Sequence, residues 1–316
     1  MENTDLGEIF KNLLNNEVRL GEVVVDIDSQ YISHNNRQLG LIKNNNKSNG
    51  LADKILSLNC GACTYRGKYP IQKLLYLTEK CKADIFCFQD IEFDDDLFEY
   101  FELQGFNFIF IPTLKYDNEF SGMLTLTKPN IDKVSLYFDE LSFSNKTENK
   151  HRSALYIQLG VLVSNITIYN CYRNSFTSYK QRKDSIGKFF QEVIKDKIVF
   201  IGDFNCYGKY IDSREKKYPF WYELSFLPQI VWTIITRVNS FNIYELKVMK
   251  RISSSYGLIL FSSSKHWTYI KKIPIPLFQI YVGWVVDLVI ANMSLQIKIV
   301  DGIIDDDHKM LAIRLK

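Results

Sequence analysis

Short apolar runs that end in polar residues recur along this chain. Runs of this length, bounded by Gly, Pro, Asn or Asp, are typical of strands that are buried in a sheet. They predict strands at 22–25, 54–59, 84–90, 106–111, 122–127, 134–138, 154–163, 165–172, 199–201, 283–292 and 310–315. Apolar residues at helical spacing predict helices at 7–20, 70–82, 97–103 and 179–195.

The order of these elements indicates the fold class. Strands come first, strand–helix alternation follows, more strands close the chain, and no internal repeat is visible. This order predicts an α/β (α+β) fold, a four-layer sandwich of two mixed β-sheets flanked by helices. Residues 34–50 are rich in Asn, Lys and Ser. We therefore predict an N-terminal extension, 1–50, with a helix and a flexible linker, and one main domain, 51–316.

Composition and charge bear on where the protein is located and what it binds. The chain has 316 residues, 46% of them hydrophobic, and a net charge of +3, which argues neither for nor against nucleic acid. The polar, acidic N-terminus does not suit a signal peptide, and the most apolar long stretch, 273–293, contains two prolines and Asp287. We expect an intracellular protein of the cytoplasm or nucleus, not secreted, with no membrane partner, and a monomer.

The cysteines do not form a metal or disulfide pattern. Cys60 and Cys63 make a CxxC pair, but no second pair follows and the chain has only four histidines. Buried free thiols in a reducing compartment fit this pattern better than a zinc site.

The most informative run is Val-Phe-Ile-Gly-Asp-Phe-Asn at 199–205. Gly202 permits a tight turn after a buried strand, and side chains two apart in an extended chain share one face. Asp203 and Asn205 are therefore expected side by side, in an arrangement suited to gripping a water molecule or a phosphate. An ordinary strand-ending turn favours the same residue types for backbone reasons alone.

Polar residues mark other strand ends as well: Asn59, Asp90, Tyr172 and the pair Asp307–His308, with Asp287 inside a strand. Polar groups gathered at strand ends are typical of a functional site on a rigid scaffold.

In this order the motifs resemble the endonuclease/exonuclease/phosphatase superfamily, the metal-dependent family of exonuclease III and DNase I. The resemblance runs from about Leu51 to Lys316 and rests on LSLN, DIFCFQD, IGDFN, GWVVDLVIAN and DDH. It implies the residue roles of that family. Asp90 would bind a divalent metal ion, Mg or Mn, with Asn59 and Asp307 close to it, and oxygen ligands suit these ions.

The resemblance also implies a catalytic set. Asp203 would orient or deprotonate the attacking water, and Asn205 would hydrogen-bond the pentacovalent phosphorus centre. His308, held in its tautomer by Asp287, would place positive charge on a non-bridging oxygen. Tyr172 would hydrogen-bond the phosphate.

One residue departs from the family pattern. The family has Glu at the metal position and this chain has Asp90. The carboxylate is shorter by roughly 1.5 Å, about one carbon–carbon bond. The metal could shift, a water could bridge, or Glu92 could contribute.

The strand end Cys-Tyr-Arg-Asn at 171–174 has no second histidine, unlike DNase I and the phosphoinositide phosphatases. It looks like exonuclease III-type apurinic endonucleases and retrotransposon endonuclease domains. That resemblance implies a DNA substrate, bound by Arg173, Asn174 and the aromatic residues Trp267 and Trp284. The alternatives are a catalytically degenerate member that binds nucleic acid or protein, and a phosphatase of a small phosphoester.

Overall fold

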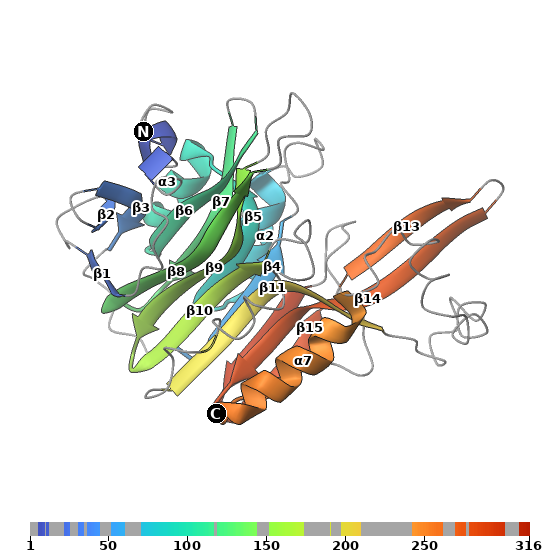
Figure 1. The fold of residues 1–316 in the computed structure, drawn as a ribbon. Coiled ribbons are helices and arrows are strands. Elements are labelled where there is room, and N and C mark those ends of the chain that lie inside the picture. Colours follow the sequence, from blue (N-terminus) through green and yellow to red (C-terminus); the bar gives the residue numbers. More distant parts are fainter. Residues whose placement is uncertain are drawn as a thin grey trace.

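The strands of this chain form two mixed sheets that lie face to face in the computed structural model (Figure 1). The structure describes residues 6–9, 11–12, 22–25, 31–34, 37–44, 52–60, 71–116, 119–143, 152–173, 190, 197–209, 242–261, 269–275, 278–300 and 310–316. The first sheet contains, in spatial order, β12 (Ile259–Phe261), β14 (Phe278–Ala291), β11 (Lys197–Lys209), β10 (Ile166–Arg173), β9 (Arg152–Val163) and β8 (Lys133–Phe143). A further strand, β13 (Tyr269–Ile275), pairs with β14, and this hairpin extends away from the sandwich (Figure 1).

The second sheet faces the first. It contains, in spatial order, β3 (Arg37–Lys43), β6 (Asn107–Tyr116), β7 (Glu119–Thr127), β5 (Ile85–Glu92), β4 (Lys54–Asn59), β16 (Met310–Leu315) and β15 (Leu295–Val300). β4 and β5 are parallel neighbours, and so are β10 and β11 in the first sheet. Because β11 contacts both β4 and β5, the two parallel pairs lie against each other at the centre of the sandwich.

Helices cover the outer faces. α2 (Ile71–Cys81) and α3 (Asp95–Leu103) bury Leu74, Leu77 and Phe101 in a core that also fills the space between the sheets. α7 (Asn242–Ser255) contacts β11 and β12, and its Met249 belongs to a second core on the outer face of the first sheet. The predicted sandwich of two mixed sheets with flanking helices is therefore confirmed.

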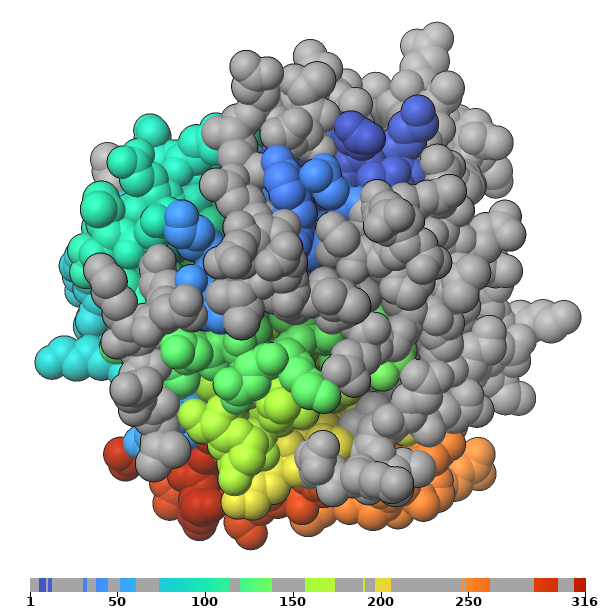
Figure 2. All heavy atoms as spheres, turned by 90° about the vertical axis from the view of Figure 1, so that its left-hand side faces the viewer, coloured from blue at the N-terminus to red at the C-terminus, as the bar shows by residue number. Residues whose placement is uncertain are grey.

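Three strands of the N-terminal segment connect the two sheets. β1 (Glu22–Val25) pairs with β8 and with β2 (Tyr31–His34), and β2 pairs with β3. In Figure 2 the described N-terminal residues (blue) lie in the upper part of the view, next to the green strands, and the orange segment that includes α7 lies at the lower edge. The division at residue 50 stays a prediction, but 37–43 of the expected linker form β3. This strand buries Leu39, Leu41 and Ile42. The many Asn and Lys residues around them make the composition of the segment polar, which is why the sequence predicts a linker there.

A local sequence signal explains where α3 begins. Asp94 caps α3, because its Oδ1 accepts the backbone N–H of Leu97 at 2.9 Å, and acidic residues fill the first turn. The predicted helices at 70–82 and 97–103 correspond to α2 and α3. The helix expected at 179–195 lies outside the described residues, except for residue 190. The structure describes only part of the helix expected at 7–20, where 6–9 and 11–12 are helical.

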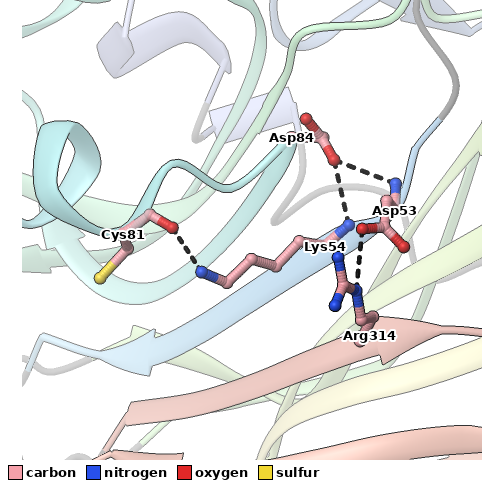
Figure 3. A network of polar contacts seen from close by, with 5 residues as sticks. All are labelled: Asp53, Lys54, Cys81, Asp84 and Arg314. Atoms are coloured by element: carbon pink, nitrogen blue, oxygen red, sulfur yellow. Dashed lines mark hydrogen bonds and ion pairs between the residues drawn. The ribbon is translucent and has the colours of Figure 1, made fainter.

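A polar network ties the entry end of β4 to its neighbours (Figure 3). Asp84 Oδ2 accepts the backbone N–H groups of Asp53 and Lys54, both at 3.0 Å. Arg314 Nε, on β16, donates to Asp53 Oδ2 at 3.0 Å, and Lys54 Nζ donates to the carbonyl oxygen of Cys81. In the part of the chain that the structure describes, no helix is both long and apolar enough to cross a bilayer.

Candidate active site

Three of the predicted site residues form a row across neighbouring strands of the first sheet. Tyr172 of β10 is the register partner of Asp203 of β11, and Asp203 is the register partner of Asp287 of β14. Register partners on adjacent strands point to the same face of a sheet. Asn170, two residues before Tyr172 on that face, donates hydrogen bonds to β5 and β7. The row therefore lies on the inner face, toward the second sheet.

The Asp203 carboxylate is the centre of the polar contacts. It is 2% exposed, and its Oδ1 accepts the backbone N–H of Asn205 at 2.8 Å. Its Oδ2 accepts Nδ2 of Asn205 at 2.9 Å and Nδ2 of Asn59 at 2.8 Å. Three donors directed at one carboxylate stabilise its ionised form and fix its orientation. The contact with Asn59 also joins the exit end of β4 to that of β11.

The backbone of β11 is unusual on both sides of Asp203. Gly202 has φ +142°, and a Cβ placed on it would lie 2.1 Å from the carbonyl oxygen of Cys171. Only glycine fits this position. Asn205 has φ +47°, and the pairing of β11 with β14 shifts register between Asp203 and Gly208. Strand irregularities of this kind redirect side chains and are common next to active sites.

The second sheet has a matching irregularity. The pairing of β5 with β7 is interrupted between Phe88 and Ile91, and Asp90, inside this bulge, has φ +50°. Asp and Asn tolerate the left-handed region better than other non-glycine residues. The bulge places Glu92 opposite Ser121 in the ladder. Two carboxylates and the amide of Asn59 thus come from adjacent strand ends of one sheet.

Comparison with known proteins places this fold. A scan against protein-family models found no match, and a search of curated protein sequences found none. The chain is similar in structure to an endonuclease/exonuclease/phosphatase family protein from Leptotrichia buccalis, with 15% identity, a TM-score of 0.51, and coverage of 84% of this chain and 100% of that one. This chain has the endonuclease/exonuclease/phosphatase fold.

Two further structures support this assignment of the fold. An AP endonuclease from Leishmania major shares 12% identity, with a TM-score of 0.51 and coverage of 100% of this chain and 99% of that one. An AP endonuclease from Archaeoglobus fulgidus shares 13% identity, with a TM-score of 0.50 and coverage of 83% and 99%. The resemblance inferred from the strand-end motifs is therefore confirmed at the level of the fold.

Within this fold, the structure brings together six of the predicted site residues. Side-chain hydrogen bonds link Asp203 to Asn59 and Asn205. Ladder pairing places Asp203 between Tyr172 and Asp287. Asp90 directly follows Gln89, the ladder partner of Asn59. Asn174, Trp267, Asp307 and His308 lie outside the described residues. The backbone of Trp284 is described, as the ladder partner of Lys209 and Tyr269.

Arg173 is not part of the row. Its side chain is 0% exposed, and strand alternation places it on the opposite face of β10 from Tyr172. Its carbonyl oxygen instead accepts Nδ2 of Asn205 at 2.6 Å, which ties the end of β10 to the irregular part of β11. Substrate binding by Arg173 stays a prediction.

The strand ends of the second sheet carry oxygen donors that could coordinate a divalent metal ion. No group of three or more His, Cys, Asp or Glu residues gathers among the described residues, and Asp307 lies outside them. Asn59, Asp90 and Glu92 nevertheless supply amide and carboxylate oxygens from neighbouring strands. Mg²⁺ is commonly held by one or two carboxylates together with waters and substrate phosphates. The donor set therefore fits Mg²⁺ or Mn²⁺.

Two buried residues of the site region were missed by the sequence reasoning. Gln89 and Asn170 form a hydrogen bond of 2.6 Å between the sheets. The available signal was the polar residue type inside apolar strands, two positions before Tyr172 in one case and directly before Asp90 in the other.

The described cysteines are thiols. Cys60, Cys87 and Cys171 are buried, Cys81 is half-buried, and none of the four forms a disulfide among the described residues. Burial raises the pKa of Cys87, and burial together with the nearby Cys87 raises the pKa of Cys171 well above its usual value. Both thiols therefore stay protonated and are poor nucleophiles or metal ligands.

Proposed function

We propose that this chain is a metal-dependent phosphodiester hydrolase that cleaves DNA. The observation that carries the proposal is the buried Asp203 carboxylate, which accepts three hydrogen bonds and stands in a row with Tyr172 and Asp287. A structural tie needs neither the left-handed backbone of Asn205 nor a second carboxylate directly opposite. Like charges opposite each other weaken a sheet, so the presence of this pair favours a chemical role.

Each residue has a role in the proposed hydrolysis. Asp203 accepts a proton from the attacking water, which then adds to phosphorus as the bond to the leaving oxygen breaks. Asn59 and Asn205 hold the carboxylate ionised and oriented. Asn205 already donates to two oxygens, so it contacts a non-bridging phosphate oxygen by exchanging its bond to Asp203 Oδ2. That exchange frees Oδ2 to take the proton.

Two further groups act on the phosphate. The Tyr172 hydroxyl donates to a non-bridging oxygen. Asp287 orients His308, which, as the family resemblance implies, places positive charge on a non-bridging oxygen. Asn59 and Asp90, with Asp307 and Glu92, would hold Mg²⁺ or Mn²⁺. When bound, this ion polarises the phosphoryl oxygen and stabilises the departing oxyanion.

DNA is proposed as the substrate on two grounds. The strand that ends at Tyr172 is not followed by the second histidine that phosphoinositide phosphatases have at this point, and it resembles the Tyr-bearing strand end of apurinic endonucleases. Two of the structures similar to this chain are AP endonucleases, so DNA with an abasic site is the first substrate to test.

The test is cleavage of supercoiled plasmid and of a duplex with one abasic site, with Mg²⁺, with Mn²⁺ and with EDTA. We expect strand cleavage with either metal and none with EDTA. An Asp203→Asn protein purified in parallel controls for contaminating nucleases. DNA binding without cleavage would support the degenerate binding protein, and hydrolysis confined to a small phosphomonoester would support the phosphatase. Either result would overturn the proposal.

A further inference from the structure

Asn170 connects the two sheets through a dense set of hydrogen bonds. It lies on β10 and is 0% exposed. Its Nδ2 donates to the carbonyl oxygens of Phe88 and Leu124, both at 3.1 Å, and approaches Thr125 Oγ1 at 3.2 Å. Its Oδ1 accepts Nε2 of Gln89 at 2.6 Å. Because backbone carbonyls can only accept, they fix which side of the amide is nitrogen.

These contacts fall at one special position of the second sheet. Phe88 and Leu124 are the last regular ladder pair before the β5 bulge that contains Asp90. Gln89 is the residue directly before Asp90. Asn170 therefore holds both strands at the point where the regular ladder ends and the chain turns to present Asp90.

Gln89 depends on this contact for its own orientation. Its Nε2 also approaches Ser57 Oγ and the carbonyl oxygen of Cys87, both at 3.1 Å. Its Oε1 is buried and accepts no hydrogen bond from the described part of the chain. The Gln89 amide is therefore fixed from one side only, and the shortest of its contacts is the one to Asn170.

The same residue is rigidly connected to the other half of the site. Asn170 pairs with Ile201 in the β10–β11 ladder, one rung before Cys171–Gly202 and two before Tyr172–Asp203. A shift of Asn170 relative to β5 is thus a shift of Tyr172 and Asp203 relative to Asp90.

We propose that Asn170 is a positioning residue that sets the Asp90 bulge relative to Asp203 and Tyr172. This inference rests on the proposed hydrolytic function, since Asn170 acts through those residues and does not itself contact substrate. Misplacement of reacting groups by about 1 Å can lower a rate by about 100-fold. Loss of Asn170 should therefore reduce turnover beyond any effect on folding.

The chain offers a matched control for a purely structural role. Asn107 of β6 is also 0% exposed, and its Nδ2 donates to the carbonyl oxygens of Pro129 and Lys128 at 2.7 and 3.4 Å. It pairs with Thr127, at the end of the β6–β7 ladder away from the bulge. Asn107→Leu removes a buried amide from the sheet that contains the β5 bulge, at the end of the β6–β7 ladder away from Asp90.

The experiment compares Asn170→Leu with Asn107→Leu in the full chain. Thermal unfolding gives the folded fraction, and kcat and KM on abasic duplex are corrected for it. Mn²⁺ affinity is measured by titration, and hydrogen exchange is followed in the peptide that spans 88–92. Asn170→Ser and Asn107→Ser provide the same comparison if a leucine variant does not fold.

We expect both variants to lose stability. Only the Asn170 variant should lower kcat, by roughly 10- to 100-fold with KM nearly unchanged, weaken Mn²⁺ binding and speed exchange at 88–92. Equal kcat, Mn²⁺ affinity and local exchange in the two variants would overturn the proposal. If the wild type cleaves no DNA, the proposed function fails, and local exchange together with Mn²⁺ affinity still decides whether Asn170 positions the bulge.

Discussion

Each end of β4 donates hydrogen bonds to an aspartate carboxylate, through backbone N–H groups at the entry end and through the Asn59 side chain at the exit end, and the two ends differ in burial and in backbone conformation. At the entry end, Asp84 accepts two N–H groups and lies partly exposed beside the Arg314–Asp53 ion pair (Figure 3). At the exit end, Asp203 is buried and accepts from Asn205 and from Asn59 of β4.

Backbone strain separates the two ends further. Lys82, near the entry end, has φ +46°, but it directly follows α2, where helices commonly end in this conformation. Asp90 and Asn205 have similar values inside strands, where nothing in ordinary strand geometry calls for them. At the entry end of β4, an aspartate carboxylate accepts hydrogen bonds next to ordinary backbone. At the exit end, the Asp203 carboxylate lies beside residues in the left-handed region, and such conformations cluster at functional sites.

The largest expected effect tests the exit end. Asp203→Asn keeps the size of the side chain but removes the proton acceptor. An amide nitrogen in place of Oδ2 would also face the Nδ2 donors of Asn59 and Asn205. We expect the cleavage rate, corrected for folded fraction, to fall by at least ~100-fold, the lower range for general-base effects. A variant that keeps a tenth of the wild-type rate would show that the chemistry does not depend on Asp203.

Gly202→Ala should give the next largest effect, on stability. Its φ alone should cost about 1–3 kcal/mol, and the new Cβ would overlap the carbonyl of Cys171, 2.1 Å away. Gly105→Ala is the matched control, because Gly105 has φ +78° with nothing within 4 Å of its added Cβ. Urea unfolding should show the larger loss at Gly202, and equal losses would mean that β11 relaxes there without cost.

Asp84→Ala tests the entry end. It leaves two backbone N–H groups without their acceptor, so unfolding free energy should fall by about 1–2 kcal/mol, as for a lost helix cap. Turnover per folded molecule should stay at the wild-type value. If turnover falls as far as in the Asp203 variant, the two ends are not functionally distinct.

Asp90→Glu should have the smallest effect and probes the departure from the family pattern. The longer side chain extends the carboxylate toward a bound metal, so Mn²⁺ should bind more tightly in a titration. Glutamate is less favourable at φ +50°, so stability should fall by up to about 1 kcal/mol. Weaker Mn²⁺ binding would instead mean that the bulge has adapted to aspartate.

The sequence was sufficient to predict the strands that carry the site. The apolar runs before Asn59, Gln89 and Asp203 predicted β4, β5 and β11, because burial on both faces produces continuous apolar strands. Strand alternation places Arg173 and Tyr172 on opposite faces of β10, and substrate binding by Arg173 stays a prediction. The roles of Asp307 and His308 stay predictions.

Other features depend on packing that no local pattern encodes. The Gln89–Asn170 bond joins residues 81 positions apart, and it exists only because the two sheets stack in one register. The bulge at Asp90 depends on how β7 pairs with β5. β3 was hidden in a polar segment, since a strand of seven residues needs few apolar side chains when it bridges two existing sheets.

The most direct test of the account is the fate of solvent oxygen in the reaction. Single-turnover cleavage of an abasic duplex is carried out with Mg²⁺ in oxygen-18-labelled water, and the phosphate-bearing product is analysed by mass spectrometry. Hydrolysis by a water activated at Asp203 predicts an oxygen-18 atom in the product phosphate for the wild type, and almost no product for Asp203→Asn. Cleavage without the label, or labelled product formed at the same rate by both proteins, would contradict the account.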